Sequence, residues 1–104
     1  MPLERFTEIL NQASEQQVPV MVFVSNKGCI QIHSGLITKL VTMENWFNVL
    51  DPQFNLHLNM DAIDQIWQVR KPSTDGDVNA LEVYDKQGNL IVQLLGNENR
   101  VFLN

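Results

Sequence analysis

The sequence has a single cysteine, Cys29, and no stretch of 18 consecutive apolar residues. One cysteine cannot form an intrachain disulfide, so the fold must depend on its core or on association with another chain. Cys29 itself is expected to be a buried strand residue. The missing apolar stretch predicts no transmembrane helix. Glu4 and Glu8 stand where a secretory signal would be basic and then apolar, so a cytoplasmic protein is expected.

Basic residues are also scarce. The 7 Lys and Arg residues against 12 Asp and Glu residues give a formal net charge of −5. Nucleic-acid binding needs clustered cations, so no nucleic-acid partner is predicted. The chain is 44% apolar and 18% charged, which is typical of a globular protein, and its 104 residues allow one domain.

The first segment, residues 3–17, predicts a helix that Pro19 ends. Its apolar residues recur at helical spacing: Leu3, Phe6, Ile9, Leu10 and Ala13.

From residue 18 the apolar period changes to two. Val20, Val22 and Val24 alternate with Met21 and Phe23, and two apolar faces predict a strand that is covered on both sides. A turn is expected at 26–28, where Asn26 and Gly28 tolerate positive φ.

The remaining segments predict further strands. We expect strands at 29–34, 36–42 and 54–58, a connection at 43–53, and a hairpin of 79–85 with 89–95 around 86–88. Residues 63–71 fit either a helix or a strand that ends before Pro72, and the strand is favoured. Residues 72–76 are expected to be a loop and 96–104 to be loose. The sequence thus predicts an α+β fold, with an N-terminal helix followed by an antiparallel meander of about six or seven strands.

Few residues carry obvious chemistry. His33 and His57 lie on the more polar faces of their strands, where each is either a metal ligand or an ordinary half-exposed residue. The chain lacks zinc-ligand spacing, a nucleophile motif and a phosphate-binding loop. Lys71 follows Arg70 at a strand end, which is either solvated or an anchor for a carboxylate. The aromatic residues Trp46, Phe47 and Trp67 are expected in the core.

Several blocks of the sequence resemble the HemS/ChuX family of haem-utilisation proteins, in the family's order and spacing. They are PVMVFVSNKGCIQIHSG at 19–35, WFNVLDP at 46–52, FNLHL at 54–58, VRKP at 69–72 and DG at 75–76. The resemblance runs from about Leu10 to Gly96 and is to the second half of the C-terminal repeat of HemS-type proteins. It implies that residues 1–104 are a single partial HemS-like repeat, that haem is the ligand and cofactor, and that the protein acts in the cytoplasm.

The resemblance also implies a set of haem-binding residues. Phe23 matches an apolar wall residue, Lys71 a haem-contacting lysine that faces a propionate, and Gln93 a polar pocket residue. The family's iron-binding histidine belongs to a segment before this region. His33 and His57 do not match this histidine, so they are candidates only for a substitute ligand of the iron.

Two positions depart from the family pattern. Leu95 stands where the family commonly has a tyrosine, and Glu98 where it has an arginine, although Arg100 is close by.

Two hypotheses follow from the resemblance. The chain either binds and transports haem, or is a truncated, non-catalytic module that associates with itself, as a homodimer or through an exposed sheet. Degradation of the haem ring needs an open iron site and a source of electrons, neither of which the sequence identifies, so enzyme activity stays open.

Overall fold

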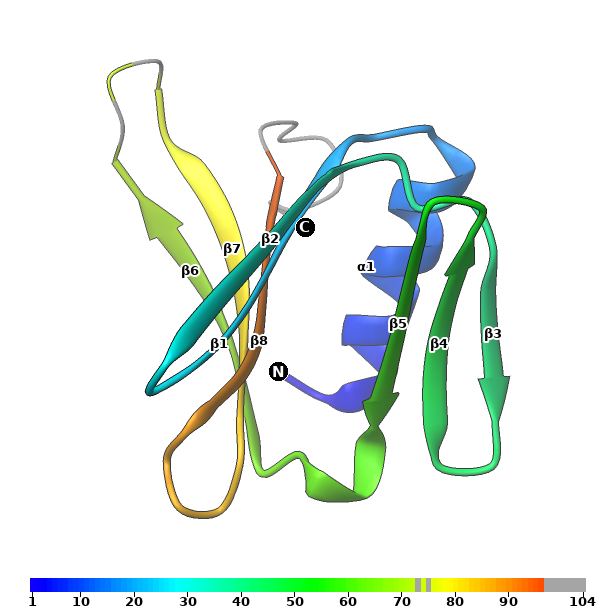
Figure 1. Ribbon diagram of the computed structural model, residues 1–104. Coiled ribbons are helices and arrows are strands. Elements are labelled where there is room, and N and C mark those ends of the chain that lie inside the picture. Colours follow the sequence, from blue (N-terminus) through cyan, green and yellow to red (C-terminus); the bar gives the residue numbers. More distant parts are fainter. Residues whose placement is uncertain (73, 75, 97–104) are drawn as a thin grey trace.

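The structure is a computed structural model that describes residues 1–72, 74 and 76–96. Its elements follow the α+β order that the sequence predicts (Figure 1). They are α1 (Leu3–Glu15), β1 (Val20–Asn26), β2 (Cys29–Gly35), β3 (Leu40–Met43), β4 (Trp46–Asp51), β5 (Phe54–Asn59), the 3-10 turn η1 (Met60–Ala62), β6 (Gln65–Lys71), β7 (Val78–Tyr84) and β8 (Leu90–Gly96).

Within the described residues, the eight strands form two antiparallel sheets. The order is β2-β1-β8-β7-β6 in the larger sheet and β3-β4-β5 in the smaller one. The strand count exceeds the expected six or seven because residues 46–51, expected in a connection, form β4. Phe47 and Val49 of β4 pair in register with Leu58 and Leu56 of β5. The arrangement is also more than a meander, since β1 pairs with β8 from the other end of the described chain.

Most other element predictions agree with the structure. The strand alternative for residues 63–71 is confirmed by β6, and the hairpin of β7 and β8 is confirmed. The third strand begins later than expected, at Leu40, while Ile37 is buried in the connection before it. Neither Asn26 nor Gly28 has a positive φ, so the turn there needs no left-handed residue. Positions 73 and 75 of the expected loop, and residues 97–104, lie outside the described residues.

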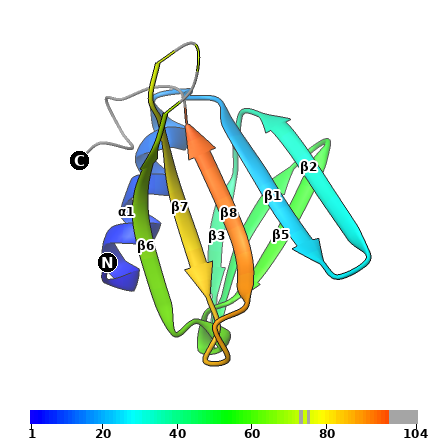
Figure 2. The same ribbon diagram turned by 90° about the vertical axis from the view of Figure 1, so that its left-hand side faces the viewer.

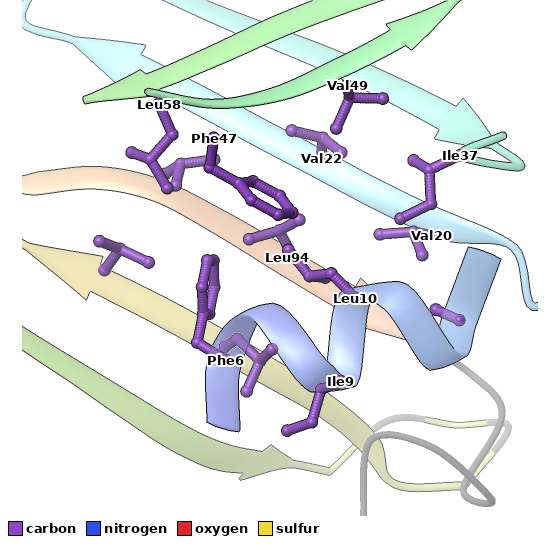
Figure 3. Packing of buried hydrophobic residues seen from close by; sticks show 14 of the residues in the cluster. Phe6, Ile9, Leu10, Val20, Val22, Ile37, Phe47, Val49, Leu58 and Leu94 are labelled. Carbon is purple, nitrogen blue, oxygen red and sulfur yellow. The ribbon is translucent and has the colours of Figure 1, made fainter. Parts of the chain in front are cut away.

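Helix α1 packs its apolar side against both sheets. Figure 3 shows Phe6 and Leu10 of the helix pointing toward Leu94 of the larger sheet and Phe47 of the smaller one. The rings of Phe6 and Phe47 meet edge to face, with their centroids 6.3 Å apart. One helix therefore joins the two sheets into a single hydrophobic core.

The face of the larger sheet turned away from α1 is not covered by any described helix or strand (Figure 2). We call it the outer face. Val20 and Val22 are buried on the helix side of β1, whereas Met21, on the outer face, is exposed. The prediction that β1 is covered on both sides is therefore wrong for the described part of the chain. An antiparallel sheet of this kind commonly packs on one face only.

Three further burial predictions are wrong. Cys29 is exposed at the start of the edge strand β2. Trp46 and Trp67 are exposed, while Phe47 is buried as expected. Each exposed side chain points away from the core because neighbouring strand residues alternate between faces. None of the helices described is long and apolar enough to cross a membrane.

Candidate functional site

A row of register partners crosses the outer face from edge to edge. It contains one residue from each strand, in the order Ile32, Phe23, Gln93, Glu82 and Trp67. Ile32, Phe23 and Trp67 are apolar, and Trp67 is 56% exposed. The centre of the row is polar, because Gln93 and Glu82 face each other across β8 and β7. The outer face therefore combines a broad apolar surface with a polar centre.

Glu82 accepts hydrogen bonds from three neighbours on this face. Its Oε2 lies 2.8 Å from Gln93 Nε2 and 3.0 Å from Lys71 Nζ. Its Oε1 accepts from the Tyr84 hydroxyl at 2.9 Å. The side chain of Glu82 is only 15% exposed, so these bonds replace the water that it has lost.

These contacts shift two pKa values. Burial raises the pKa of Glu82, but the hydrogen bonds from Lys71, Tyr84 and Gln93 and the charge of Lys71 together bring it below its ordinary value. The bond to Glu82 raises the pKa of Tyr84, and burial and the negative charge of Glu82 act in the same direction. At neutral pH Glu82 is thus ionised and Tyr84 is a neutral donor.

A hollow opens beside this network, over β6, β7 and the turn between β7 and β8. Its volume is about 540 Å³, within the range of ligand sites in proteins. It is lined by Asp64, Gln65, Trp67, Val69, Glu82, Tyr84, Asp85, Lys86 and Gly88.

Three of the five predicted site residues lie together on the outer face. Phe23 and Gln93 are direct register partners, and Lys71 shares Glu82 with Gln93. The two histidines lie elsewhere. His33 pairs with Val22, so it points to the opposite side of the larger sheet from Phe23.

The ring of His33 stacks on Phe54 of β5, with the ring centroids 4.1 Å apart and the planes 3° from parallel. His57 lies in the smaller sheet, where its Nδ1 is 2.8 Å from Asn48 Oδ1. The five residues therefore do not form one site, and neither histidine can serve a ligand that lies on the outer face.

Sequence reasoning missed Glu82, Tyr84 and the exposure of Trp67. The hairpin pattern did not reveal Glu82, because the register at the turn pairs Tyr84 with Leu90 and would place Glu82 opposite Val92. A register shift between Val83 and Tyr84 places Glu82 opposite Gln93 instead. The contact between Lys71 and Glu82 could not be predicted from the sequence, because the two residues are not register partners.

Comparison with known proteins agrees with this architecture. The model of the haemin-degrading HemS/ChuX domain matches residues 1–101. The hemin transport protein HemS of Yersinia enterocolitica is 42% identical over 90 residues, which is 86% of this chain and 26% of that protein.

Two solved structures are also similar. The holo form of PhuS, a heme-binding protein from Pseudomonas aeruginosa, superimposes with a TM-score of 0.87 at 48% identity, covering 94% of this chain and 28% of that one. The heme-degrading enzyme ChuS of Escherichia coli O157:H7 does so with a TM-score of 0.83 at 39% identity, covering 93% and 29%.

The protein is therefore an α+β domain in which one face of an antiparallel sheet packs on a helix and the other face is open. The chain belongs to the HemS/ChuX domain family. It spans about a quarter of the length of the curated relative that it matches.

Proposed function

We propose that this chain binds haem against the outer face and acts in haem transport and utilisation. The observation that carries the proposal is the placement of Lys71, Gln93 and Phe23 on one open sheet face. The names of the relatives support the ligand, since HemS is a hemin transport protein and PhuS is a heme-binding protein.

The outer face fits the chemistry of haem, a flat apolar ring that carries two carboxylates. Phe23 and Trp67 offer apolar and aromatic surface on either side of the polar centre. Lys71 has three N–H donors and a side chain that is 42% exposed. It can therefore bind a carboxylate of the ligand while it keeps its ion pair with Glu82.

Among the described residues, no histidine lies on the outer face. In this proposal the face holds the ring and its carboxylates, and the bond to iron comes from outside the described outer-face residues. We further propose that residues 1–104 are part of one HemS-like repeat and that the protein acts in the cytoplasm.

The test is a titration with haemin followed by absorbance. We expect a saturable, sharpened Soret band at one haem per chain or per dimer, and a loss of affinity in Lys71→Ala. Arg70→Ala is the matched control. It removes a cation from the next position of β6, which points to the other side of the sheet. Equal affinity in Lys71→Ala and the natural chain would contradict the proposed site.

Self-association through the outer face is a second candidate. Met21, Ile30, Ile32 and Trp67 are exposed large apolar residues on this face. Such a surface favours association with a second copy of the chain. Size-exclusion chromatography of the same sample separates the candidates, because a dimer that gives no specific Soret band would favour association alone.

A further inference from the structure

The charges at the centre of the outer face cancel each other. Within the strand residues that the structure describes, Lys71 is the one basic side chain on this face and Glu82 is the one acidic side chain. The two form an ion pair, with 3.0 Å between Nζ and Oε2. The hollow beside them is lined by three further charged residues, Asp64, Asp85 and Lys86, which add no surplus of positive charge. The strands of this face and the hollow together therefore offer an anion no net positive charge.

Glu82 is held in place beside Lys71, because both oxygens of its carboxylate accept hydrogen bonds. Oε2 also accepts from Gln93 Nε2 at 2.8 Å, and Oε1 accepts from the Tyr84 hydroxyl at 2.9 Å. The side chain of Glu82 is only 15% exposed, and it is ionised at neutral pH. A fixed negative charge therefore stays next to the ammonium group when a second anion approaches it.

A ligand carboxylate that binds Lys71 meets this fixed charge at short range. The ammonium group has three donors and its side chain is 42% exposed, so a second acceptor can reach it. Two oxygens bound to one ammonium group lie about 5 Å apart, a distance at which salt screens charges only weakly. Repulsion between the two carboxylates therefore offsets much of the attraction to Lys71. The charge of the ligand contributes less to binding than it would beside a lysine without this partner.

We propose that Glu82 is a specificity-determining residue of the outer face, which competes with the carboxylate of a ligand for Lys71. This inference rests on the proposed function, because it concerns the same site. Glu82 lowers the affinity of the face for anions in general, so apolar contact with Phe23 and Trp67 decides which ligand is retained. Small anionic metabolites lack a large apolar surface and are excluded. A bound ring is also released more readily than it would be with Lys71 alone.

The test compares a porphyrin with and without its two negative charges. Metal-free protoporphyrin IX and its dimethyl ester are titrated into the whole chain and followed by fluorescence, so no bond to iron enters the comparison. Glu82→Gln keeps the size of the side chain and an acceptor for Tyr84, but it removes the competing charge. We expect this variant to bind the diacid about fivefold more tightly and the ester with unchanged affinity. Glu15→Gln is the matched control, since it removes the same charge from an exposed position at the end of α1, and it should change neither affinity.

The dependence of binding on salt gives an independent measurement that needs no variant. Because Glu82 neutralises Lys71, the affinity of the natural chain for the diacid, relative to that for the ester, should not fall as NaCl is added. In Glu82→Gln the same ratio should fall, since Lys71 then acts as a free cation. A fall in the natural chain would overturn the proposal, even if Glu82→Gln did not fold.

The outcomes separate this proposal from the proposed function. Lys71→Ala should weaken the binding of the diacid and leave that of the ester unchanged. If the natural chain binds neither compound, or if Lys71→Ala has no effect, the proposed function fails and the role of Glu82 fails with it. If Lys71→Ala weakens the binding of the diacid while Glu82→Gln leaves it unchanged or weakens it too, the site is confirmed. Glu82 then only supports Lys71, and the competition is overturned.

Discussion

Lys71 Nζ lies 3.0 Å from Glu82 Oε2, although the two residues are not register partners. Lys71 pairs with Val78 at the end of β6, and Glu82 pairs with Trp67 four residues earlier in the same strand. Val69 comes between Trp67 and Lys71 on the same face, so the two side chains must extend toward each other along the sheet. The contact places a cation beside the apolar surface while a partly buried carboxylate holds it there.

The folded chain should become less stable as the pH decreases, because Glu82 becomes protonated. Its pKa is lowered in the folded chain, so the unfolded chain takes up the proton first as the pH decreases. The stabilising contribution is complete above the ordinary value of 4.5 and is lost as the pH falls through the lower folded value. The measurement is the free energy of unfolding between pH 7 and pH 3 for the natural chain and for Glu82→Gln.

We expect the two stability curves to converge as the medium becomes acidic, because Gln does not titrate. Glu15→Gln is the control for general charge effects, since it removes the same charge from an exposed position at the end of α1. Parallel curves for Glu82→Gln and the natural chain would show that Glu82 does not contribute to the acid loss of stability.

Two turn glycines should respond differently to alanine. Gly88 has φ +84°, a conformation that alanine disfavours, and an added Cβ would have no neighbour within 4 Å. Gly88→Ala should therefore cost about 1 kcal/mol through the backbone alone. Gly28 has no such φ, and its added Cβ would meet Asn26 at an ordinary 3.8 Å. Urea unfolding of Gly28→Ala should give a midpoint close to that of the natural chain, and a similar loss in both variants would contradict the backbone argument.

Local patterns predicted the helix and most hairpins because each depends on residues close in sequence. The alternation of Val20 and Val22 with Met21 and Phe23 identified β1, and the pattern around residues 86–88 identified the last hairpin. The pairing of β1 with β8 and the division into two sheets depend on distant contacts, which one sequence does not display. The candidate site could be predicted only in part for the same reason. The resemblance to the HemS/ChuX family suggested Lys71 and Gln93, whereas Glu82 emerged only when the sheet brought the three together.

The contact between Phe6 and Phe47 should be a main support of the core. Phe6 is fully buried and meets Phe47 edge to face at 6.3 Å, which joins α1 to the smaller sheet. Phe6→Ala should reduce the free energy of unfolding by about 3–5 kcal/mol, since it removes a buried ring and leaves a cavity. Trp67→Ala is the control, because it removes a larger side chain from an exposed position. Denaturant unfolding checks both, and an equal cost in the two variants would place Trp67 in a packed environment instead.

Ile32 tests whether the outer face joins two copies of the chain. Ile32 is exposed on β2, at one end of the row that contains Phe23 and Gln93. A carboxylate there would require desolvation of a charge in any dimer that buries this face, so Ile32→Glu should shift such a dimer toward monomer with little change in folding stability. Met43→Glu is the matched control, since it puts the same charge on the exposed face of the smaller sheet. Sedimentation velocity over a range of concentrations gives the measurement. If Met43→Glu dissociates the dimer and Ile32→Glu does not, the smaller sheet is the contact, and the outer face stays open to a ligand in the assembled protein.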